Sequence, residues 1–241
     1  MSVFPSSVIA ALSALRDLIF PQNCIICGNA LQEGTENICL DCMMDLPLNS
    51  SHETYGNDIE KRLWSKERLV ARKIEFATSY LLYDKGNSTS KILHSIKYHG
   101  NQKLAIQMGR YFARELKGGR WDGIDCLIPV PLHPKKFKKR GYNQSECICD
   151  GLSDVLGKPT ITDVLVRNVA NETQTKKNAQ DRWANVQGIF SAKNTEKIVG
   201  MHIAIVDDVL TTGATIEACI AAFDGIKNIK ISVLTLASTS K

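Results

Sequence analysis

The spacing of hydrophobic residues predicts a helix at the start of the chain and a strand that begins near residue 74. Residues 1–20 carry apolar side chains at helical spacing, which predicts an amphipathic helix that packs on its own protein. Docking of that helix on a membrane or a partner is the alternative. From residue 74, β-branched and aromatic residues predict a strand or hairpin arm over 74–84, and helical periodicity returns at 89–98 and 102–116.

Short apolar segments and helical segments then alternate toward the C-terminus. Strands are predicted at 125–129, 161–166, 202–206 and 230–236, with helices at 143–156 and 214–223 between them. Strands that alternate with helices in this way are typical of a parallel sheet with helices on both faces. The sequence therefore predicts an α/β fold for this part of the chain.

Four of the eight cysteines form two closely spaced pairs, Cys24 with Cys27 and Cys39 with Cys42, separated by eleven residues. Two residues between cysteines allow both sulfurs to face one ion at about 2.3 Å, and two such pairs complete a closed tetrahedral shell. We predict a structural zinc ion here. Two disulfides or four free thiols are the alternatives, and disulfides are disfavoured in a chain without a secretion signal.

A polar stretch at 49–58 separates this module from the rest, so we expect two domains, 1–55 and 56–241. The composition, 44% hydrophobic and 23% charged, is typical of a soluble protein, and no segment is long enough to span a membrane. We expect a cytoplasmic protein. Residues 1–75 hold 7 basic and 10 acidic side chains, and the remainder holds 23 and 15. A basic larger part suits an anionic partner, either a phosphorylated small molecule or a nucleic acid.

The clearest chemical signal follows the strand predicted at 202–206. That strand ends in Asp207 and Asp208, and a turn at Thr211 to Thr215 leads into the next helix. Backbone N–H groups and hydroxyls at a helix N-terminus favour a phosphate, whereas two carboxylates suit ribose hydroxyls and Mg²⁺. The alternative is an ordinary strand, turn and capped helix with an incidental acid pair.

The run IAIVDDVLTTGAT resembles the phosphoribosyl pyrophosphate motif of type I phosphoribosyltransferases. Further segments, together with the four-cysteine module, resemble the ComF family of competence-associated proteins. These segments are Ile128 to Pro131, Arg140 to Gln144, Gln174 to Arg182, Asn185-Val186 and Gly188 to Phe190. The resemblance implies a type I phosphoribosyltransferase fold, phosphoribosyl pyrophosphate with Mg²⁺ as ligand, and an association with DNA uptake.

The resemblance also implies roles for individual residues. Asp207 and Asp208, the catalytic pair, would hold the ribose 2′- and 3′-hydroxyls. The residues implied in binding the phosphates are Thr211, Thr212, Gly213, Ala214 and Thr215 for the 5′-phosphate, Pro129, Val130 and Pro131 for the pyrophosphate, and Lys97, Arg140 and Arg182 in addition. By the same resemblance, the polar segment 167–187 would be a lid that excludes water.

The segment from Lys135 to Arg140 contains five cationic side chains, which are compatible with more than one kind of partner. They could neutralise pyrophosphate, follow a nucleic-acid backbone, or form a solvated loop. Tyr142 could stack on a base or pack beneath the loop. We therefore expect a phosphoribosyltransferase with an unknown acceptor. The alternatives are a competence factor that binds single-stranded DNA and contacts competence-machinery proteins, or a regulator that senses phosphoribosyl pyrophosphate without turnover.

Overall fold

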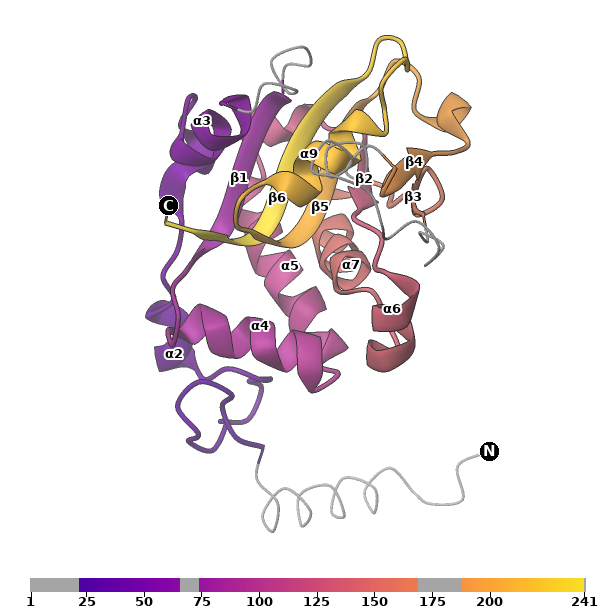
Figure 1. Cartoon of the computed structure of the whole chain (residues 1–241). Helices are drawn as coiled ribbons and strands as arrows, with labels where there is room; N and C mark the ends of the chain where they lie inside the picture. Colours follow the sequence, from indigo (N-terminus) through magenta and orange to yellow (C-terminus); the bar gives the residue numbers. More distant parts are fainter. Residues whose placement is uncertain (1–21, 66–73, 169–187, 241) are drawn as a thin grey trace, which may run out of the picture. The chain divides into compact units, whose positions relative to one another are not determined.

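The computed structural model describes residues 22–65, 74–168 and 188–240 (Figure 1). The chain divides into two compact units, Met1–Leu46 and Pro47–Lys241. Residues 47–55 group with the larger unit because Leu48 bridges to Leu81 and the Asn49 N–H donates to the Tyr80 carbonyl oxygen at 2.8 Å. The helix predicted at 1–20, Arg182 and most of the predicted lid lie outside the described residues.

A four-stranded parallel sheet forms the centre of the larger unit, with the strand order β1-β6-β5-β2. The strands are β1 (Ile74–Tyr83), β2 (Cys126–Pro129), β5 (His202–Leu210) and β6 (Lys230–Thr239). Pro129 lies opposite Val206, and Asp207 lies opposite Thr235. The carboxyl ends of β2 and β5 therefore meet at one edge of the sheet, where α/β folds bind ligands.

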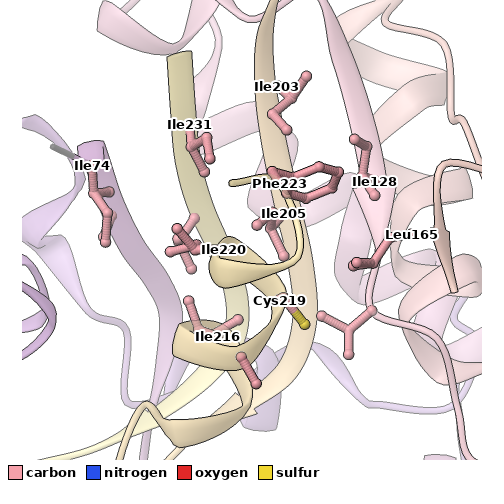
Figure 2. Close-up of a cluster of buried hydrophobic side chains, with 14 of the residues drawn as sticks. Ile74, Ile128, Leu165, Ile203, Ile205, Ile216, Cys219, Ile220, Phe223 and Ile231 are labelled. Carbon is pink, nitrogen blue, oxygen red and sulfur yellow. The ribbon is translucent and has the colours of Figure 1, made fainter. Parts of the chain in front are cut away.

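Helices cover both faces of this sheet, as the sequence predicted. On one face, α9 (Ala214–Ala221) and α3 (Asp58–Trp64) enclose a hydrophobic cluster that includes Ile203, Ile205 and Phe223 (Figure 2). Contacts to the sheet also come from α4 (Ser88–Tyr98), α5 (Gln102–Leu116) and α7 (Gln144–Leu156). These three helices contribute no residue to that cluster, so they cover the opposite face. The α/β class with a parallel sheet is confirmed.

The prediction that residues 161–166 form a strand of this sheet is wrong. Pairing with β2 is limited to the bridge of Thr160 to Leu127 and the Ile161 N–H, which donates to the Leu127 carbonyl oxygen at 2.9 Å. The next strand, β3 (Leu165–Arg167), pairs antiparallel with β4 (Phe190–Ala192) in a separate ribbon. The chain turns at Asp163, which accepts a hydrogen bond from the Asn194 side chain at 2.9 Å. Leu165 instead buries its side chain in the cluster beneath α9. Val164 and Leu165 are therefore buried without pairing to the sheet.

Two glycines set the distance between α5 and α7. A Cβ atom added at Gly109 would lie 2.4 Å from the Ile148 carbonyl oxygen, and one at Gly151 would lie 2.0 Å from the Ile106 carbonyl oxygen. The two backbones therefore approach as closely as their atoms allow. This contact fixes α7, whose first turn reaches the ligand edge of the sheet.

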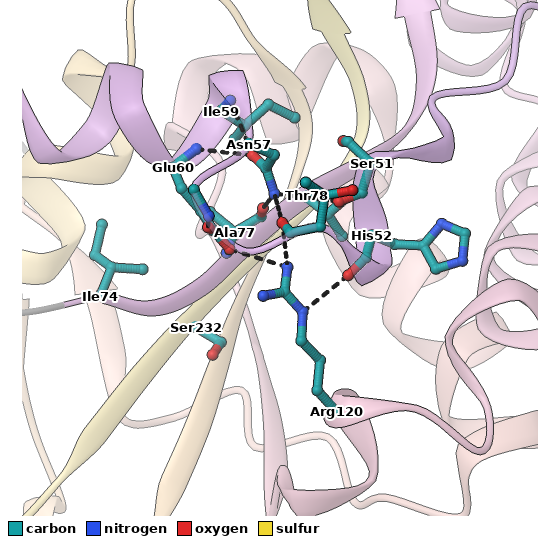
Figure 3. A network of polar contacts seen from close by, with 12 residues as sticks. Ser51, His52, Asn57, Ile59, Glu60, Ile74, Ala77, Thr78, Arg120 and Ser232 are labelled. Atoms are coloured by element: carbon teal, nitrogen blue, oxygen red, sulfur yellow. Dashed lines mark hydrogen bonds and ion pairs between the residues drawn. The ribbon is translucent and has the colours of Figure 1, made fainter.

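A buried ion pair joins α3 to the 3₁₀ turn η2 (Arg120–Gly123), as Figure 3 shows. Glu60 is fully buried, and its Oε1 accepts from Arg120 Nη2 at 3.0 Å and from the Ala77 N–H at 3.2 Å. Its Oε2 accepts from the Gly56 N–H at 2.6 Å. Every carboxylate oxygen is thus paired, as a buried charge requires.

Two further helices are short, α2 (Leu40–Met44) and α6 (Pro134–Arg140). Within the ranges that the structure describes, none of the helices combines the length and the hydropathy that a bilayer span requires.

Candidate functional site

The four clustered cysteines form a site whose geometry fits one zinc ion. Their sulfur atoms all lie within 4.8 Å of one another, and Cys27 Sγ is 3.7 Å from Cys39 Sγ. Zinc–sulfur bonds of about 2.3 Å in a tetrahedron place sulfurs about 3.8 Å apart. The fold arranges this locally, because the Gly28 N–H donates to the Cys24 carbonyl oxygen in a tight turn and Cys39 precedes α2.

The titration of these thiols agrees with metal binding. Although burial acts against it, hydrogen bonds from the backbone N–H groups of Cys27 and Cys39 lower the pKa of Cys24 to about 6. Desolvation and the neighbouring thiols raise the pKa of Cys42. One thiolate therefore forms readily and opposes ionisation of its neighbours, until a cation compensates the charge. Four sulfurs leave no position for a substrate, so the zinc site is structural.

Asp207 and Asp208 lie inside β5 near its carboxyl end, because the strand continues to Leu210 instead of ending at Val206 as predicted. Burial and the charge of Asp208 raise the pKa of Asp207 to about 7. Two donors favour its ionised form, because Asp207 Oδ1 accepts from the Asp208 N–H at 2.8 Å and from Ser145 Oγ at 3.3 Å. Asp208 Oδ1 lies 3.0 Å from Lys97 Nζ, and both side chains are largely buried. The two acids therefore have different environments.

The turn after β5 forms a small pocket at the start of α9. Its lining includes Asp207 and the residues from Thr211 to Thr215. Gly213 precedes the helix in the left-handed conformation at φ 82°, a backbone geometry that glycine adopts without strain. No side chain caps this helix, although the Ala214 N–H contacts Thr212 Oγ1 at 3.4 Å. The first N–H groups of α9 therefore face the pocket, as an anion site requires.

The segment after β2 lies beside β5 at the same edge. The Val130 N–H donates to the Val206 carbonyl oxygen at 2.9 Å, and Asn143 Nδ2 donates to the Val130 carbonyl oxygen at 3.1 Å. These bonds fix the loop that contains Pro129, Val130 and Pro131. The structure thus brings this loop and the acid pair to one edge of the sheet. The start of α7 also links them, because its N-cap residue Asn143 bonds to Val130 and Ser145 in its first turn bonds to Asp207.

Arg140 ends α6, and its Nη1 donates to Gln144 Oε1 at 2.7 Å. Its guanidinium carbon lies 5.5 Å from the centre of the Tyr98 ring. Tyr142 is buried, and its hydroxyl donates to the Ile96 carbonyl oxygen, so of its two predicted roles the structure shows packing beneath the loop. None of the side chains of α6 is buried, which leaves Lys135 to Lys139 at the surface.

Two residues near the site carry no signal in the sequence. Arg62 of α3 donates from Nη1 to the Thr211 carbonyl oxygen at 3.0 Å and from Nη2 to the Thr239 carbonyl oxygen at 2.8 Å. It therefore fixes the turn at Thr211 to the end of β6. Ser145 donates to Asp207. For Lys97, sequence reasoning suggested a place in the site but no role, and the structure gives it one as the partner of Asp208.

A known family model matches the N-terminal part of the chain. Residues 15–54 match the double zinc ribbon domain family. The matched range holds four cysteines, which suffice for one tetrahedral zinc site. Zinc is thus supported both by this match and by the cysteine geometry.

Two solved structures of phosphoribosyl enzymes are also similar, although distantly. Glutamine phosphoribosylpyrophosphate amidotransferase from Bacillus subtilis is 18% identical with a TM-score of 0.37, covering 55% of this chain and 26% of that enzyme. The chain thus spans about a quarter of its length. Adenine phosphoribosyltransferase from Leishmania tarentolae is 11% identical with a TM-score of 0.36, covering 66% of this chain and 90% of the other. Likenesses this distant establish no shared activity.

Three proteins are similar in sequence. DNA utilization protein YhgH of Shigella flexneri is 29% identical over 198 residues, covering 80% of each chain. Competence protein F of Haemophilus influenzae is 36% identical over 94 residues, which is 39% of this chain and 41% of that protein. Competence protein ComFC of Bacillus subtilis is 26% identical over 194 residues, covering 80% of this chain and 74% of that protein. The chain is therefore a homologue of the ComF-type competence and DNA-utilization proteins, as its motifs predicted.

Proposed function

We propose that this protein binds phosphoribosyl pyrophosphate with Mg²⁺ at the carboxyl edge of its sheet and transfers the phosphoribosyl group to an acceptor. The observation that carries the proposal is the junction of β5 and α9. There, two carboxylates on one strand adjoin a helix N-terminus without a side-chain cap. The names of its relatives support a role in DNA uptake or utilization.

The pocket at the start of α9 suits the 5′-phosphate. Backbone N–H groups of Ala214 and Thr215 and the hydroxyls of Thr211 and Thr212 would donate to its oxygens. The Asp207 carboxylate also lines this pocket and would repel a phosphate, so we propose that it contacts a different group of the same ligand. Arg62 keeps the turn in place through the Thr211 carbonyl oxygen.

The acid pair suits the ribose. A ribose presents two neighbouring hydroxyls that donate hydrogen bonds, and ionised Asp207 and Asp208 accept them. Lys97 compensates one of the two charges, which keeps the pair compatible with the phosphates of the same ligand. Mg²⁺, which prefers carboxylate, phosphate and hydroxyl oxygens, would neutralise the charge of the pyrophosphate when bound.

The loop of Pro129, Val130 and Pro131 would receive the pyrophosphate beside β5. In the proposed transfer, the bond from ribose C1 to the pyrophosphate oxygen breaks and pyrophosphate leaves with the electron pair. The acceptor's lone pair then forms the new bond to C1. Asp207 and Asp208 lie where positive charge develops on the ribose, so their contribution is electrostatic stabilisation and positioning.

A second function, binding of single-stranded nucleic acid, is favoured by one observation on α6. Phe137 is 48% exposed and stands among Lys135, Lys136, Lys138 and Lys139, which are also exposed. Cations beside an exposed aromatic ring suit a phosphate backbone with stacked bases. Such binding would weaken steeply with salt and would require neither acid.

Calorimetric titration of phosphoribosyl pyrophosphate with Mg²⁺ into the full chain tests the ligand. We expect saturable binding that the double variant Asp207→Ala, Asp208→Ala loses. The single variant Asp58→Ala, at a side chain that is 95% exposed, serves as a control and retains it. Absence of binding to the unaltered chain, or equal binding by the double variant, would refute the site. Pyrophosphate release with an acceptor would separate a transferase from a sensor that binds without turnover.

A further inference from the structure

Arg62 joins the ends of two neighbouring strands beside the pocket at the start of α9. The pairing of β5 with β6 ends at Leu210 and Ser238. One residue further along, Arg62 Nη1 donates to the Thr211 carbonyl oxygen at 3.0 Å, and Nη2 donates to the Thr239 carbonyl oxygen at 2.8 Å. The guanidinium group from α3 therefore continues the connection between the two strands at the point where their own backbone pairing ends.

The bond to Thr211 sets the direction of the N–H group that follows it. The peptide bond between Thr211 and Thr212 is trans, so its carbonyl oxygen and its N–H point in opposite directions within one rigid plane. Because the carbonyl oxygen points to Arg62, the Thr212 N–H points away from Arg62. Thr212 lines the pocket and Arg62 does not. The Thr212 N–H therefore suits a donor to an anion in the pocket.

The turn itself has only weak support from its own residues. Gly213 adopts φ 82°, and α9 begins without a side-chain cap. The contact from the Ala214 N–H to Thr212 Oγ1 is long at 3.4 Å, and the side chains of Thr211 and Thr212 are exposed. A turn of this kind loses conformational freedom when a ligand binds, which costs affinity. Arg62 orders the turn before the ligand arrives, so this cost is smaller.

The contact depends on the shape of the guanidinium group. Arg62 Nη1 also lies 3.2 Å from Thr239 Oγ1, so two nitrogens of one planar group bond to three oxygens on two segments of the chain. A lysine has a single nitrogen on a flexible stem and cannot reproduce this geometry. Arg62 is half-buried, which limits the competition from water for these bonds.

We infer that Arg62 is the positioning residue of this pocket and that it acts by presenting the Thr212 N–H to the phosphate group of a sugar 5-phosphate. The inference rests on the proposed binding of a 5′-phosphate in the same pocket. Arg62 does not touch the ligand in this arrangement, since the bonds of Nη1 and Nη2 go to Thr211 and Thr239. The pocket therefore depends on α3, an element far from β5 and α9 in the sequence.

Calorimetric titration of ribose 5-phosphate into the full chain tests the inference. We expect Arg62→Ala to weaken binding about tenfold, because one oriented donor is lost, and Arg62→Lys to weaken it nearly as much. Guanidinium ion, added to Arg62→Ala at a concentration too low to unfold the protein, should restore part of the affinity because it can occupy the vacated place. It should not raise the affinity of the unaltered chain. Arg110→Ala is the matched control, since Arg110 bonds to Asp154 on α7 and lies outside the pocket.

The outcomes distinguish the role of Arg62 from the proposed function. Equal binding by Arg62→Ala and the unaltered chain, or a loss that guanidinium ion does not reverse, would overturn the role of Arg62 while the proposed 5′-phosphate site stands. If Arg62→Ala does not fold, Arg62→Lys decides, because full affinity in that variant would show that the planar group is not needed. If the unaltered chain binds no ribose 5-phosphate, the proposed site itself is refuted and the inference falls with it.

Discussion

Replacement of Asp207 by asparagine should make the ligand-free protein more stable at pH 8. Burial and the charge of Asp208 raise the pKa of Asp207 from 3.8 to about 7. Each pKa unit corresponds to about 1.4 kcal/mol, so ionisation of this group costs the folded state up to about 4 kcal/mol. Solvent reaches Asp207 through the pocket at the start of α9 and screens part of this cost. We therefore expect a gain of about 1–3 kcal/mol.

The gain should depend on pH in a defined direction. Between pH 4 and pH 7 the folded chain holds the Asp207 proton while the unfolded chain has released it, so stability falls as pH rises through this window. Asparagine does not titrate. It also keeps a carbonyl oxygen that can accept from the Asp208 N–H and from Ser145. The advantage of Asp207→Asn should thus be smaller at pH 5 than at pH 8.

Urea unfolding followed by circular dichroism at pH 5 and pH 8 measures this difference. Lys97→Met provides a variant with the opposite sign at pH 8, because it removes the cation that favours ionised Asp207 and leaves Asp208 without its partner. A stability difference for Asp207→Asn that is equal at both pH values, or a loss of stability at pH 8, would refute the reasoning.

Three further predictions concern the fold. Glu60→Gln should lower the free energy of unfolding by about 3–5 kcal/mol in urea, because it leaves the partly buried Arg120 guanidinium without a counter-charge. Exposed Asp58→Asn should change it by less than about 0.5 kcal/mol. Gly151→Ala should cost about 1–3 kcal/mol by the same assay, since its Cβ would lie 2.0 Å from a carbonyl oxygen of α5. Elemental analysis should find one zinc ion per chain, lost in Cys39→Ser and retained in Cys149→Ser.

Each of these has a contrary result. Unchanged stability of Glu60→Gln would mean that the ion pair contributes nothing net. Unchanged stability of Gly151→Ala would mean that the two helices separate without cost. Full zinc content in Cys39→Ser would exclude a four-sulfur shell.

The sequence by itself determined the features that depend on neighbouring residues. The helix predicted at 102–116 coincides with α5, because its apolar spacing is strongly periodic. The pairs of cysteines with two residues between them predicted the metal module. The glycine-containing turn predicted the start of α9 at Ala214, although β5 runs to Leu210, beyond its predicted end at Val206. In each case the geometry is set within a few residues, where spacing along the chain fixes distance in space.

Tertiary structure alone decided which distant side chains meet. Lys97 pairs with Asp208, Ser145 donates to Asp207, and Arg62 holds the turn at Thr211, although these partners come from different elements. Tertiary structure also turned the segment after Ile161 away from the sheet, into a separate ribbon. Hydrophobic periodicity records which face of an element is buried but not what that face meets. The crossing of α5 and α7 and the order of the strands supply that information.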